Sequence, residues 1–222
     1  MIEEDLWRFE SRLIKKGFQY IAGVDEAGRG PLAGPVVAAA VILPPSHHCL
    51  DDFVTLRESK QLTPKRREFF YDLIQTMAVS IGVGMTGVKY IDHYNILEAT
   101  KRAMKQAITK LRLQPDYVLV DAVALEGVSP LEVIVRGDQQ SASIAAASIV
   151  AKVVRDRLMT EWDRTYPGYG FVRNKGYGTP EHLNALTQLG PSPIHRLSFK
   201  PVRAAAQKGV GDNEQQDIGR TG

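Results

Sequence analysis

Several features that define whole classes of protein are absent from this sequence of 222 residues. It has one cysteine, Cys49, so no disulfide can form within the chain. The longest apolar run, residues 36–45, is far shorter than the roughly 18 residues that a membrane-spanning helix needs, and we expect no membrane partner. The first residues, Met-Ile-Glu-Glu-Asp, lack the basic and apolar regions of a signal peptide. Together these absences predict a cytoplasmic protein.

A large excess of charge of one sign is also absent. The 28 lysines and arginines nearly balance the 25 aspartates and glutamates, so the formal net charge is only +3. The total charge therefore does not by itself indicate a nucleic-acid-binding protein, and the positions of the charges have to decide. Hydrophobic residues make up 44% of the chain, which is typical of a globular protein with a sizeable core.

The apolar residues of the chain follow two periodicities. Five short segments are typical of β-strands, and they are residues 20–24, 36–43, 79–86, 117–120 and 131–136. Helical spacing is found in residues 3–16, 95–111 and 141–158, and Thr-Pro pairs at 63–64 and 179–180 predict two further helix starts. The segment 36–43 is apolar without alternation, which indicates a strand covered on both faces. We therefore expect an α/β fold with a mixed five-stranded sheet flanked by helices.

Carboxylates stand at the carboxyl ends of three of the expected strands. The four acids, two of them adjacent in the chain, are Asp25, Glu26, Asp121 and Asp138. A mixed α/β sheet places such strand ends near one crevice, where four negative charges would repel one another. A pair of Mg²⁺ or Mn²⁺ ions, which prefer oxygen ligands, would offset this repulsion and can promote phosphodiester hydrolysis. The alternative is that each acid forms a structural ion pair with Arg29 or a nearby lysine.

The adjacent acids Asp25 and Glu26 cannot both face one metal ion from a regular strand, because neighbouring side chains of a strand point to opposite faces. We therefore expect the strand to become irregular after Asp25. The glycines at positions 28 and 30 would permit such a change in the direction of the backbone.

The glycine-rich stretch after these acids is not a dinucleotide-binding fingerprint. The run Gly28-Arg29-Gly30 follows an expected strand, as that fingerprint requires. The third glycine is missing, because Ala33 stands in its place, and Pro35 leads into a strand where the fingerprint opens a helix. The glycines instead give a backbone that a ligand can approach closely.

The motifs of this chain, in their order, resemble those of the type 2 ribonucleases H, most closely bacterial ribonuclease HII. The resemblance covers residues 18–202. The motifs that carry it are Asp25-Glu26-Ala27-Gly28-Arg29-Gly30-Pro31, Ser59-Lys60, Asn95-Ile96-Leu97, Val120-Asp121, Gly137-Asp138, residues 145–152 with Arg155-Asp156, Lys175-Gly176-Tyr177 and the run His195-Arg196-Leu197-Ser198-Phe199.

This resemblance implies a defined set of site residues. Those that it implies for catalysis and metal binding are Asp25, Glu26, Asp121 and Asp138. Those that it implies for substrate binding are Gly28, Arg29, Gly30, Lys60, Asn95 and Tyr177. The backbone of residues 28–30 would contact the ribose 2′-hydroxyl, the group that separates RNA from DNA, and Tyr177 would stack on the adjoining deoxyribose. The alternatives are an ordinary core aromatic for Tyr177 and a solvated basic cluster for Lys60 with residues 65–67.

The resemblance also implies how the chain is divided. We expect an N-terminal helix at residues 1–17, a ribonuclease H-like catalytic domain at 18–165 and a small helical C-terminal appendage at 166–203 that completes the substrate site. Residues 204–222 are rich in glycine, glutamine and charge and poor in apolar residues, which predicts a disordered tail. The composition of the tail points to no particular partner.

The function that the resemblance implies is that of a metal-dependent endoribonuclease that works as a monomer in the cytoplasm. It would cut the RNA strand of RNA/DNA hybrids and cut 5′ to ribonucleotides embedded in duplex DNA, leaving 5′-phosphate and 3′-hydroxyl ends. Two other functions are open to the same residues. One is a DNA nuclease of the integrase or resolvase kind, and the other is a protein that binds hybrids without cutting them.

Overall fold

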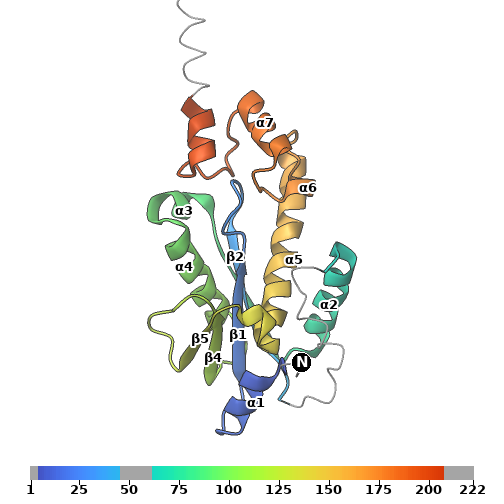
Figure 1. The fold of residues 1–222 in the computed structure, drawn as a ribbon, viewed down its shortest axis with the longest axis vertical. Helices are drawn as coiled ribbons and strands as arrows, with labels where there is room; N and C mark the ends of the chain where they lie inside the picture. The colour runs from blue at the N-terminus through green and yellow to red at the C-terminus, as the bar shows by residue number, and fades with distance from the viewer. Residues whose placement is uncertain (1–4, 46–61, 208–222) are drawn as a thin grey trace, which may run out of the picture. The chain divides into compact units, whose positions relative to one another are not determined.

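The computed structural model describes residues 5–45 and 62–207, and Figure 1 shows its elements. The described residues form two compact units. The first unit takes its residues from Met1–Ala27, Val36–Thr86 and Thr100–Arg155, and the second from Gly28–Pro35, Gly87–Ala99 and Asp156–Gly222. Each unit has a hydrophobic core of its own.

The first unit is built on a mixed five-stranded sheet, which confirms the expected fold class. Its strands are β1 (Ile21–Ala27), β2 (Val36–Ile42), β3 (Ser80–Thr86), β4 (Tyr117–Asp121) and β5 (Leu131–Ile134). Across the sheet their order is β3-β2-β1-β4-β5. Strand β2 is antiparallel to β1 and β3, whereas β4 is parallel to β1 and β5 is parallel to β4. The carboxyl ends of β1, β4 and β5 therefore lie at the same end of the sheet.

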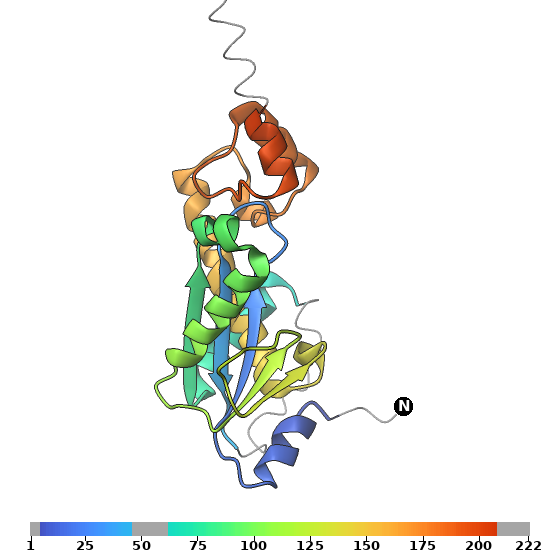
Figure 2. The same cartoon turned by 90° about the vertical axis from the view of Figure 1, so that its left-hand side faces the viewer.

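Two helices cover opposite faces of this sheet, and Figure 2 shows α4 in front of the strands and α5 behind them. Helix α4 (Ile96–Thr109) lies so close to β3 that a Cβ added at Gly82 would be 2.0 Å from a carbonyl oxygen of the helix. On the other face, α5 (Ala142–Thr165) begins beside Gly23, where an added Cβ would be 2.0 Å from the helix backbone. Glycine at these strand positions is what allows the helices to approach so closely.

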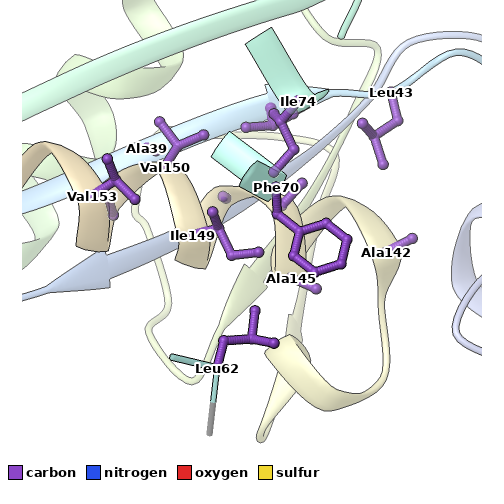
Figure 3. Close-up of a cluster of buried hydrophobic side chains, with 14 of the residues drawn as sticks. Ala39, Leu43, Leu62, Phe70, Ile74, Ala142, Ala145, Ile149, Val150 and Val153 are labelled. Carbon is purple, nitrogen blue, oxygen red and sulfur yellow. The ribbon is translucent and has the colours of Figure 1, made fainter. Parts of the chain in front are cut away.

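Helix α2 (Pro64–Met77) closes the core on the α5 side of the sheet. Its start agrees with the prediction, because the hydroxyl of Thr63 accepts a hydrogen bond from the backbone N–H of Arg66. Phe70 and Ile74 of α2 are buried, and Figure 3 shows them directed toward the side chains of α5 and the sheet. This packing holds α5 against the strands that carry the acids.

The short helix α1 (Arg8–Ile14), within the expected segment 3–16, contacts the start of α5 through a buried carboxylate. Glu10 is 3% exposed, and its Oε1 accepts hydrogen bonds from the backbone N–H of Ser143 at 3.0 Å and from the hydroxyls of Ser141 and Ser143 at 2.5 Å. A negative charge here also interacts favourably with the positive end of the helix dipole. Helix α1 therefore helps to place α5.

The second unit is mainly helical. Its elements are α3 (Val88–Tyr94), the last part of α5, α6 (Phe171–Asn174), α7 (Pro180–Leu189) and a helix described from 200 to 207. The start of α7 agrees with the prediction, because the hydroxyl of Thr179 accepts a hydrogen bond from the backbone N–H of His182. No helix among the described residues is long and apolar enough to cross a membrane.

Two boundaries in the second unit differ from those expected. Helix α5 continues to Thr165 rather than ending at 158, because no glycine or proline interrupts it before Pro167. Of the tail expected from 204 onward, residues 204–207 belong to the C-terminal helix, and residues 208–222 lie outside the described part of the chain.

Candidate functional site

Two of the predicted acids, Asp25 and Asp121, are neighbours at the carboxyl end of the sheet. Strands β1 and β4 are parallel, and their last paired residues are Val24 and Val120, so each acid is the next residue of its strand. Asp25 lies two residues after Gly23 and therefore faces α5, as the hydrogen bond from the Ser148 side chain to its carboxylate also shows. The structure thus brings together two of the four acids from separate parts of the chain.

Strand β1 stays regular beyond Asp25, so the prediction that it becomes irregular there is wrong. The ladder between β1 and β2 continues to Ala27, which pairs with Val37. The Cβ of Glu26 is therefore on the face of the sheet opposite to that of Asp25. The ladder between β1 and β4 ends at Val24, so Glu26 lies beyond the part of β1 that β4 flanks. Its carboxylate is still near enough to raise the pKa of Asp25.

Burial and neighbouring charge both disfavour the ionised form of Asp25, which is 4% exposed. Burial, followed by the negative charges of Glu26 and Asp121, raises the pKa of Asp25 well above its ordinary value of 3.8. Hydrogen bonds from Ser148 and from the backbone N–H of Glu26, at 2.7 Å, favour the ionised form but do not offset these effects. A cation beside Asp25 would relieve the repulsion.

The fourth acid, Asp138, lies in a 3₁₀ turn that follows β5 and spans Gly137–Gln139. It is fully buried, with 0% of its surface exposed. The residue before it is joined to the acid pair, because the backbone N–H of Gly137 donates a hydrogen bond to Oδ1 of Asp121 at 2.7 Å. The turn that carries Asp138 is therefore fixed to the end of β4.

The donor set of these acids suits a hard divalent cation. It consists of carboxylate oxygens, which Mg²⁺ and Mn²⁺ prefer, and lacks the cysteine and histidine ligands typical of zinc. Within residues 5–45 and 62–207, no group of three or more His, Cys, Asp or Glu side chains lies close enough together to hold a metal ion. Mg²⁺ needs fewer protein ligands, because it binds through one or two carboxylates and completes its shell with water and substrate phosphate. The pair Asp25 and Asp121 meets that requirement.

The loop of residues 28–34 belongs to the second unit and exposes two of the residues predicted to contact a ribose. Gly28 is buried with a φ of +98°, a conformation that favours glycine, whereas Arg29 and Gly30 are exposed. A Cβ added at Gly30 would be 3.6 Å from Cε1 of Tyr177, so the tyrosine ring lies beside the loop. Tyr177 is 46% exposed and is not a core aromatic. These predicted substrate-binding residues therefore form one surface of the second unit.

A tight turn places Tyr177 beside this loop. The buried side chain of Asn174 spans the turn, since its Oδ1 accepts a hydrogen bond from the N–H of Gly176 at 2.8 Å and its amide nitrogen donates to a backbone carbonyl at 2.7 Å. The carbonyl of Gly176 accepts a hydrogen bond from the N–H of Leu32 at 2.7 Å. The turn is therefore bonded directly to the loop of residues 28–34.

Arg196, which appeared in the sequence only as part of a family motif, binds this loop from its buried side. It is 0% exposed, and its guanidinium donates hydrogen bonds to three backbone carbonyls. These belong to Gly28 at 2.5 Å, Arg29 at 2.8 Å and Gly34 at 2.9 Å. Sequence reasoning missed this role because backbone carbonyls carry no side-chain signal and these lie more than 160 positions away in the chain.

A buried pair of histidines, His182 and His195, is bonded to the backbone of Tyr177. Their Nε2 atoms are 3.0 Å apart. Nδ1 of His195 accepts a hydrogen bond from the N–H of Ser192 at 2.9 Å, so its proton is on Nε2 and is donated to His182. His182 then carries its proton on Nδ1 and donates it to the carbonyl of Tyr177 at 2.8 Å. These bonds assign both rings to the neutral form.

We expect this pair to make the fold sensitive to acid. Burial, and then the neighbouring His182, lower the pKa of His195 from 6.5 to about 4, and burial also lowers the pKa of His182. Below pH 6.5, His195 is protonated in the unfolded chain but stays neutral in the folded protein. Protonation therefore favours unfolding, and stability is lost as the pH falls toward 4. The expected loss in the free energy of unfolding is about 3 kcal/mol, and urea unfolding at a series of pH values would measure it.

A glutamine at position 195 is the control for this prediction. The charged groups near the histidines are Glu181, which raises the pKa of His182, and Arg173, which pairs with Glu181. His195→Gln keeps a donor toward His182 but removes the titrating ring. The variant should therefore lose about 3 kcal/mol less than the wild type over the same pH range. Equal losses in the two proteins would contradict the assignment.

The structure does not place the other two predicted substrate-binding residues, Asn95 and Lys60, on this surface. Asn95 caps α4, because its Oδ1 accepts hydrogen bonds from the N–H groups of Leu97 at 2.9 Å and Glu98 at 3.1 Å. A contact of Asn95 with substrate stays a prediction. Lys60 lies outside the described residues.

Comparisons with known proteins agree with this fold and these motifs. The family model for ribonuclease HII matches residues 22–202. Ribonuclease HII of Listeria innocua is 53% identical over 201 residues, which are 90% of this chain and 76% of that protein. Ribonuclease HII of Geobacter sulfurreducens is 54% identical over 204 residues, which are 89% of this chain and 90% of that protein. The crystal structure of ribonuclease H2 from Pyrococcus horikoshii OT3 matches with a TM-score of 0.73 and 28% identity, over 85% of this chain and 98% of that one.

These matches confirm the resemblance that the motifs indicated. The matched residues include the four acids, the loop of residues 28–34 and Tyr177. The mixed five-stranded sheet agrees with the solved structure of the related enzyme. The chain therefore belongs to the ribonuclease HII family and is a hydrolase, an endoribonuclease of ribonuclease H type 2.

Proposed function

We propose that this protein cuts the RNA strand of RNA/DNA hybrids and also cuts 5′ to ribonucleotides embedded in duplex DNA, leaving 5′-phosphate and 3′-hydroxyl ends. The observation that carries the proposal is that Asp25 and Asp121 each directly follow the last paired residues of the parallel strands β1 and β4, Val24 and Val120. Asp25 is a buried acid whose ionised form is disfavoured by two acidic neighbours. Such an acid is suited to hold a cation that also binds substrate phosphate.

Asp25 and Asp121 would hold the metal, with Glu26 and Asp138 as the further acids that the family motifs indicate. When bound, Mg²⁺ or Mn²⁺, as a two-ion site, supplies activation of water and stabilisation of the leaving oxygen. The protein prepares Asp25 for this role through the side chain of Ser148, which donates a hydrogen bond to its carboxylate. It restrains Asp121 through the hydrogen bond from the backbone of Gly137.

Recognition of the ribose is assigned to the second unit. Arg29 and Gly30 are exposed residues, and their backbone N–H groups are suited to donate hydrogen bonds to the 2′-hydroxyl and the neighbouring phosphates. The exposed ring of Tyr177, beside Gly30, is suited to stack on the sugar that follows the last ribonucleotide. Lys60 and Asn95 are included in the proposed substrate contacts on the family motifs alone.

The physiological setting belongs to the same proposal. We infer that the protein acts as a monomer in the cytoplasm, on RNA/DNA hybrid and on duplex DNA that contains ribonucleotides. The single cysteine and the short apolar runs of the sequence support the cytoplasmic location.

Wild-type protein is expected to cut a DNA duplex that contains one ribonucleotide and to leave the all-deoxy duplex of the same sequence intact. The physical reason is that the 2′-hydroxyl is the group by which the loop can distinguish the two substrates. The measurement is gel electrophoresis of end-labelled duplexes with Mg²⁺ and with Mn²⁺, and chelator provides the metal-free control. The end groups follow from ligation of the products and from their sensitivity to phosphatase.

Each of the other outcomes contradicts the proposal in its own way. Equal cutting of both duplexes would indicate a DNA nuclease of the integrase or resolvase kind. Tight binding of the ribonucleotide-containing duplex without cutting, in the presence of either metal, would indicate a hybrid-binding protein.

A further inference from the structure

One buried segment, residues 194–196, contacts both elements to which the proposed function assigns the ribose. It runs alongside the loop of residues 28–34, to which it is joined by an isolated antiparallel bridge. The N–H of Gly34 donates a hydrogen bond to the carbonyl of residue 194 at 2.8 Å, and the N–H of residue 196 donates to the carbonyl of Leu32 at 2.9 Å. The backbone of this segment therefore fixes the distal half of the loop.

The side chain of Arg196 fixes the proximal half, where it sets the direction of two peptide groups. The carbonyls of Gly28 and Arg29 point toward its guanidinium, at 2.5 and 2.8 Å. In a trans peptide the C=O and N–H point in opposite directions. The N–H groups of Arg29 and Gly30 are therefore directed away from Arg196, and these two residues are the exposed ones. Arg196 thereby turns hydrogen-bond donors outward on the surface that Tyr177 adjoins.

The neighbouring residue, His195, is connected through His182 to the second of these elements, Tyr177. It is 2% exposed and donates to His182, which is 0% exposed and in turn bonds the carbonyl of Tyr177. The carbonyl of the preceding Gly176 is bonded to the loop itself. Two consecutive carbonyls are therefore held: that of Gly176 by the loop, and that of Tyr177 by His182, which is itself bonded to segment 194–196 through His195.

We propose that Arg196 and the His182–His195 pair are positioning residues that set the specificity of this enzyme for ribose. Arg196 holds the donors of Arg29 and Gly30 outward, and the histidine pair holds Tyr177 beside them. The inference rests on the proposed function, because that function assigns the ribose to this loop and to Tyr177. No contact of Arg196 or of either histidine with substrate is part of the proposal.

Binding preference separates a positioning role from a purely structural one. A substitution that merely loosens the fold lowers the affinity for every duplex in the same proportion. A substitution that lets the loop peptides rotate weakens contacts to phosphates in both duplexes but also removes a contact to the 2′-hydroxyl, which all-deoxy DNA lacks. It therefore lowers the affinity for the ribonucleotide-containing duplex more than that for all-deoxy DNA. The ratio of the two dissociation constants is therefore the quantity to measure.

The experiment uses the full chain with Asp25→Asn as the background, which prevents turnover while binding is measured in Mg²⁺. The dissociation constants are measured for a duplex with one ribonucleotide and for the matching all-deoxy duplex. Adding Arg196→Lys is expected to reduce the preference for the ribonucleotide about tenfold or more, because an ammonium cannot bind three carbonyls in the fixed geometry of a guanidinium. Arg203→Lys, at an exposed arginine of the C-terminal helix, is the matched control and is expected to leave the preference unchanged.

A pair of substitutions at position 182 tests the role of the histidine pair and does not depend on how Arg196→Lys folds. His182→Asn can still donate a hydrogen bond to the carbonyl of Tyr177, whereas His182→Leu fills similar space without a donor. The leucine variant is expected to lose severalfold of the preference and the asparagine variant to retain most of it. Thermal unfolding of both variants establishes that the comparison is made between folded proteins.

The outcomes distinguish this inference from the proposed function. If Asp25→Asn alone shows no preference for the ribonucleotide, the proposed recognition of the ribose is wrong. If that preference is present but persists unchanged in Arg196→Lys and in His182→Leu, the positioning role is wrong and the proposed function stands. A proportional loss of affinity for both duplexes in these variants would also overturn the inference, since it indicates a purely structural role.

Discussion

Replacing Asp25 with asparagine is expected to lower the rate of cleavage about a thousandfold or more and to raise the melting temperature of the metal-free protein. A bound metal contributes several kcal/mol to the stabilisation of the transition state, and each 1.36 kcal/mol is a factor of ten in rate. The gain in stability follows from the raised pKa of Asp25, since burial, Glu26 and Asp121 all disfavour the charge that asparagine lacks. In a chain of this size, each kcal/mol gained raises the melting temperature by roughly 2–4 °C.

Thermal unfolding with chelator and with Mg²⁺, together with the cleavage assay, would measure both effects. The wild type is expected to gain stability when Mg²⁺ is added, and Asp25→Asn to gain less. Asparagine keeps an Oδ1 that can accept the hydrogen bonds of Ser148 and of the Glu26 backbone, so the change is confined to charge. Asp72→Asn, at an exposed acid of α2, is the matched control and should change neither property. Retained turnover or a lowered melting temperature in Asp25→Asn would refute the assignment.

The positions of Asp25 and Asp121 were predictable because each follows an apolar segment directly. A buried strand is a local signal, and the residue that ends its apolar run is identified without knowledge of the fold. The parallel pairing of β1 and β4 then makes the two ends neighbours, as expected for a mixed α/β sheet. Their proximity thus required only local patterns and a general rule of topology.

The path of β1 after Asp25 was not predictable in this way. Asp-Glu-Ala has low β propensity, and two glycines follow within three residues, which favours an irregular backbone. In the structure β2 supplies a fully buried partner as far as Val37, and this pairing keeps Glu26 in the strand. The tertiary contact overrides the local preference, and it is made by a segment whose position the local sequence does not encode.

The groups behind the loop could not be found from patterns at all. Arg196 bonds to carbonyls of residues 28, 29 and 34, and any residue in those places would offer the same carbonyl. The histidines at 182 and 195 are separated by a segment with turn signals, so their spacing suggests neither a metal site nor a pair. A buried arginine or histidine becomes informative only when its partners are known, because burial of such a group requires that it be hydrogen-bonded.

Asn95 illustrates the opposite case, in which a residue matched a family motif and was given a single role. Its side chain caps α4 by accepting hydrogen bonds from the backbone N–H groups of Leu97 and Glu98. Capping alone accounts for asparagine at this position. The motif therefore supports a substrate contact less strongly than it does for Tyr177, whose exposed ring has no comparable role in the fold.

Gly30→Ala is expected to lower kcat/KM for a duplex with one ribonucleotide about ten- to a hundredfold without destabilising the protein. The added methyl group would be 3.6 Å from Cε1 of Tyr177, an ordinary van der Waals contact, and the φ of Gly30 is not in the left-handed region. Alanine at such a position is neutral or stabilises by about 0.4–1 kcal/mol, because it restricts the unfolded chain. The methyl group would stand on the exposed surface of the loop, where it is expected to keep a sugar from approaching the backbone as closely as glycine allows.

Two other glycines turn this prediction into a test of close approach rather than of backbone freedom. Gly87→Ala, at a residue of ordinary φ with nothing within 4 Å, should leave cleavage unchanged. Gly28→Ala places alanine at a φ of +98° and should reduce both together. Reduced cleavage with unchanged or increased stability is therefore expected of Gly30→Ala alone among the three. Full activity in that variant would mean that the ribose does not approach this backbone. The proposed recognition of the ribose by the loop would then be wrong.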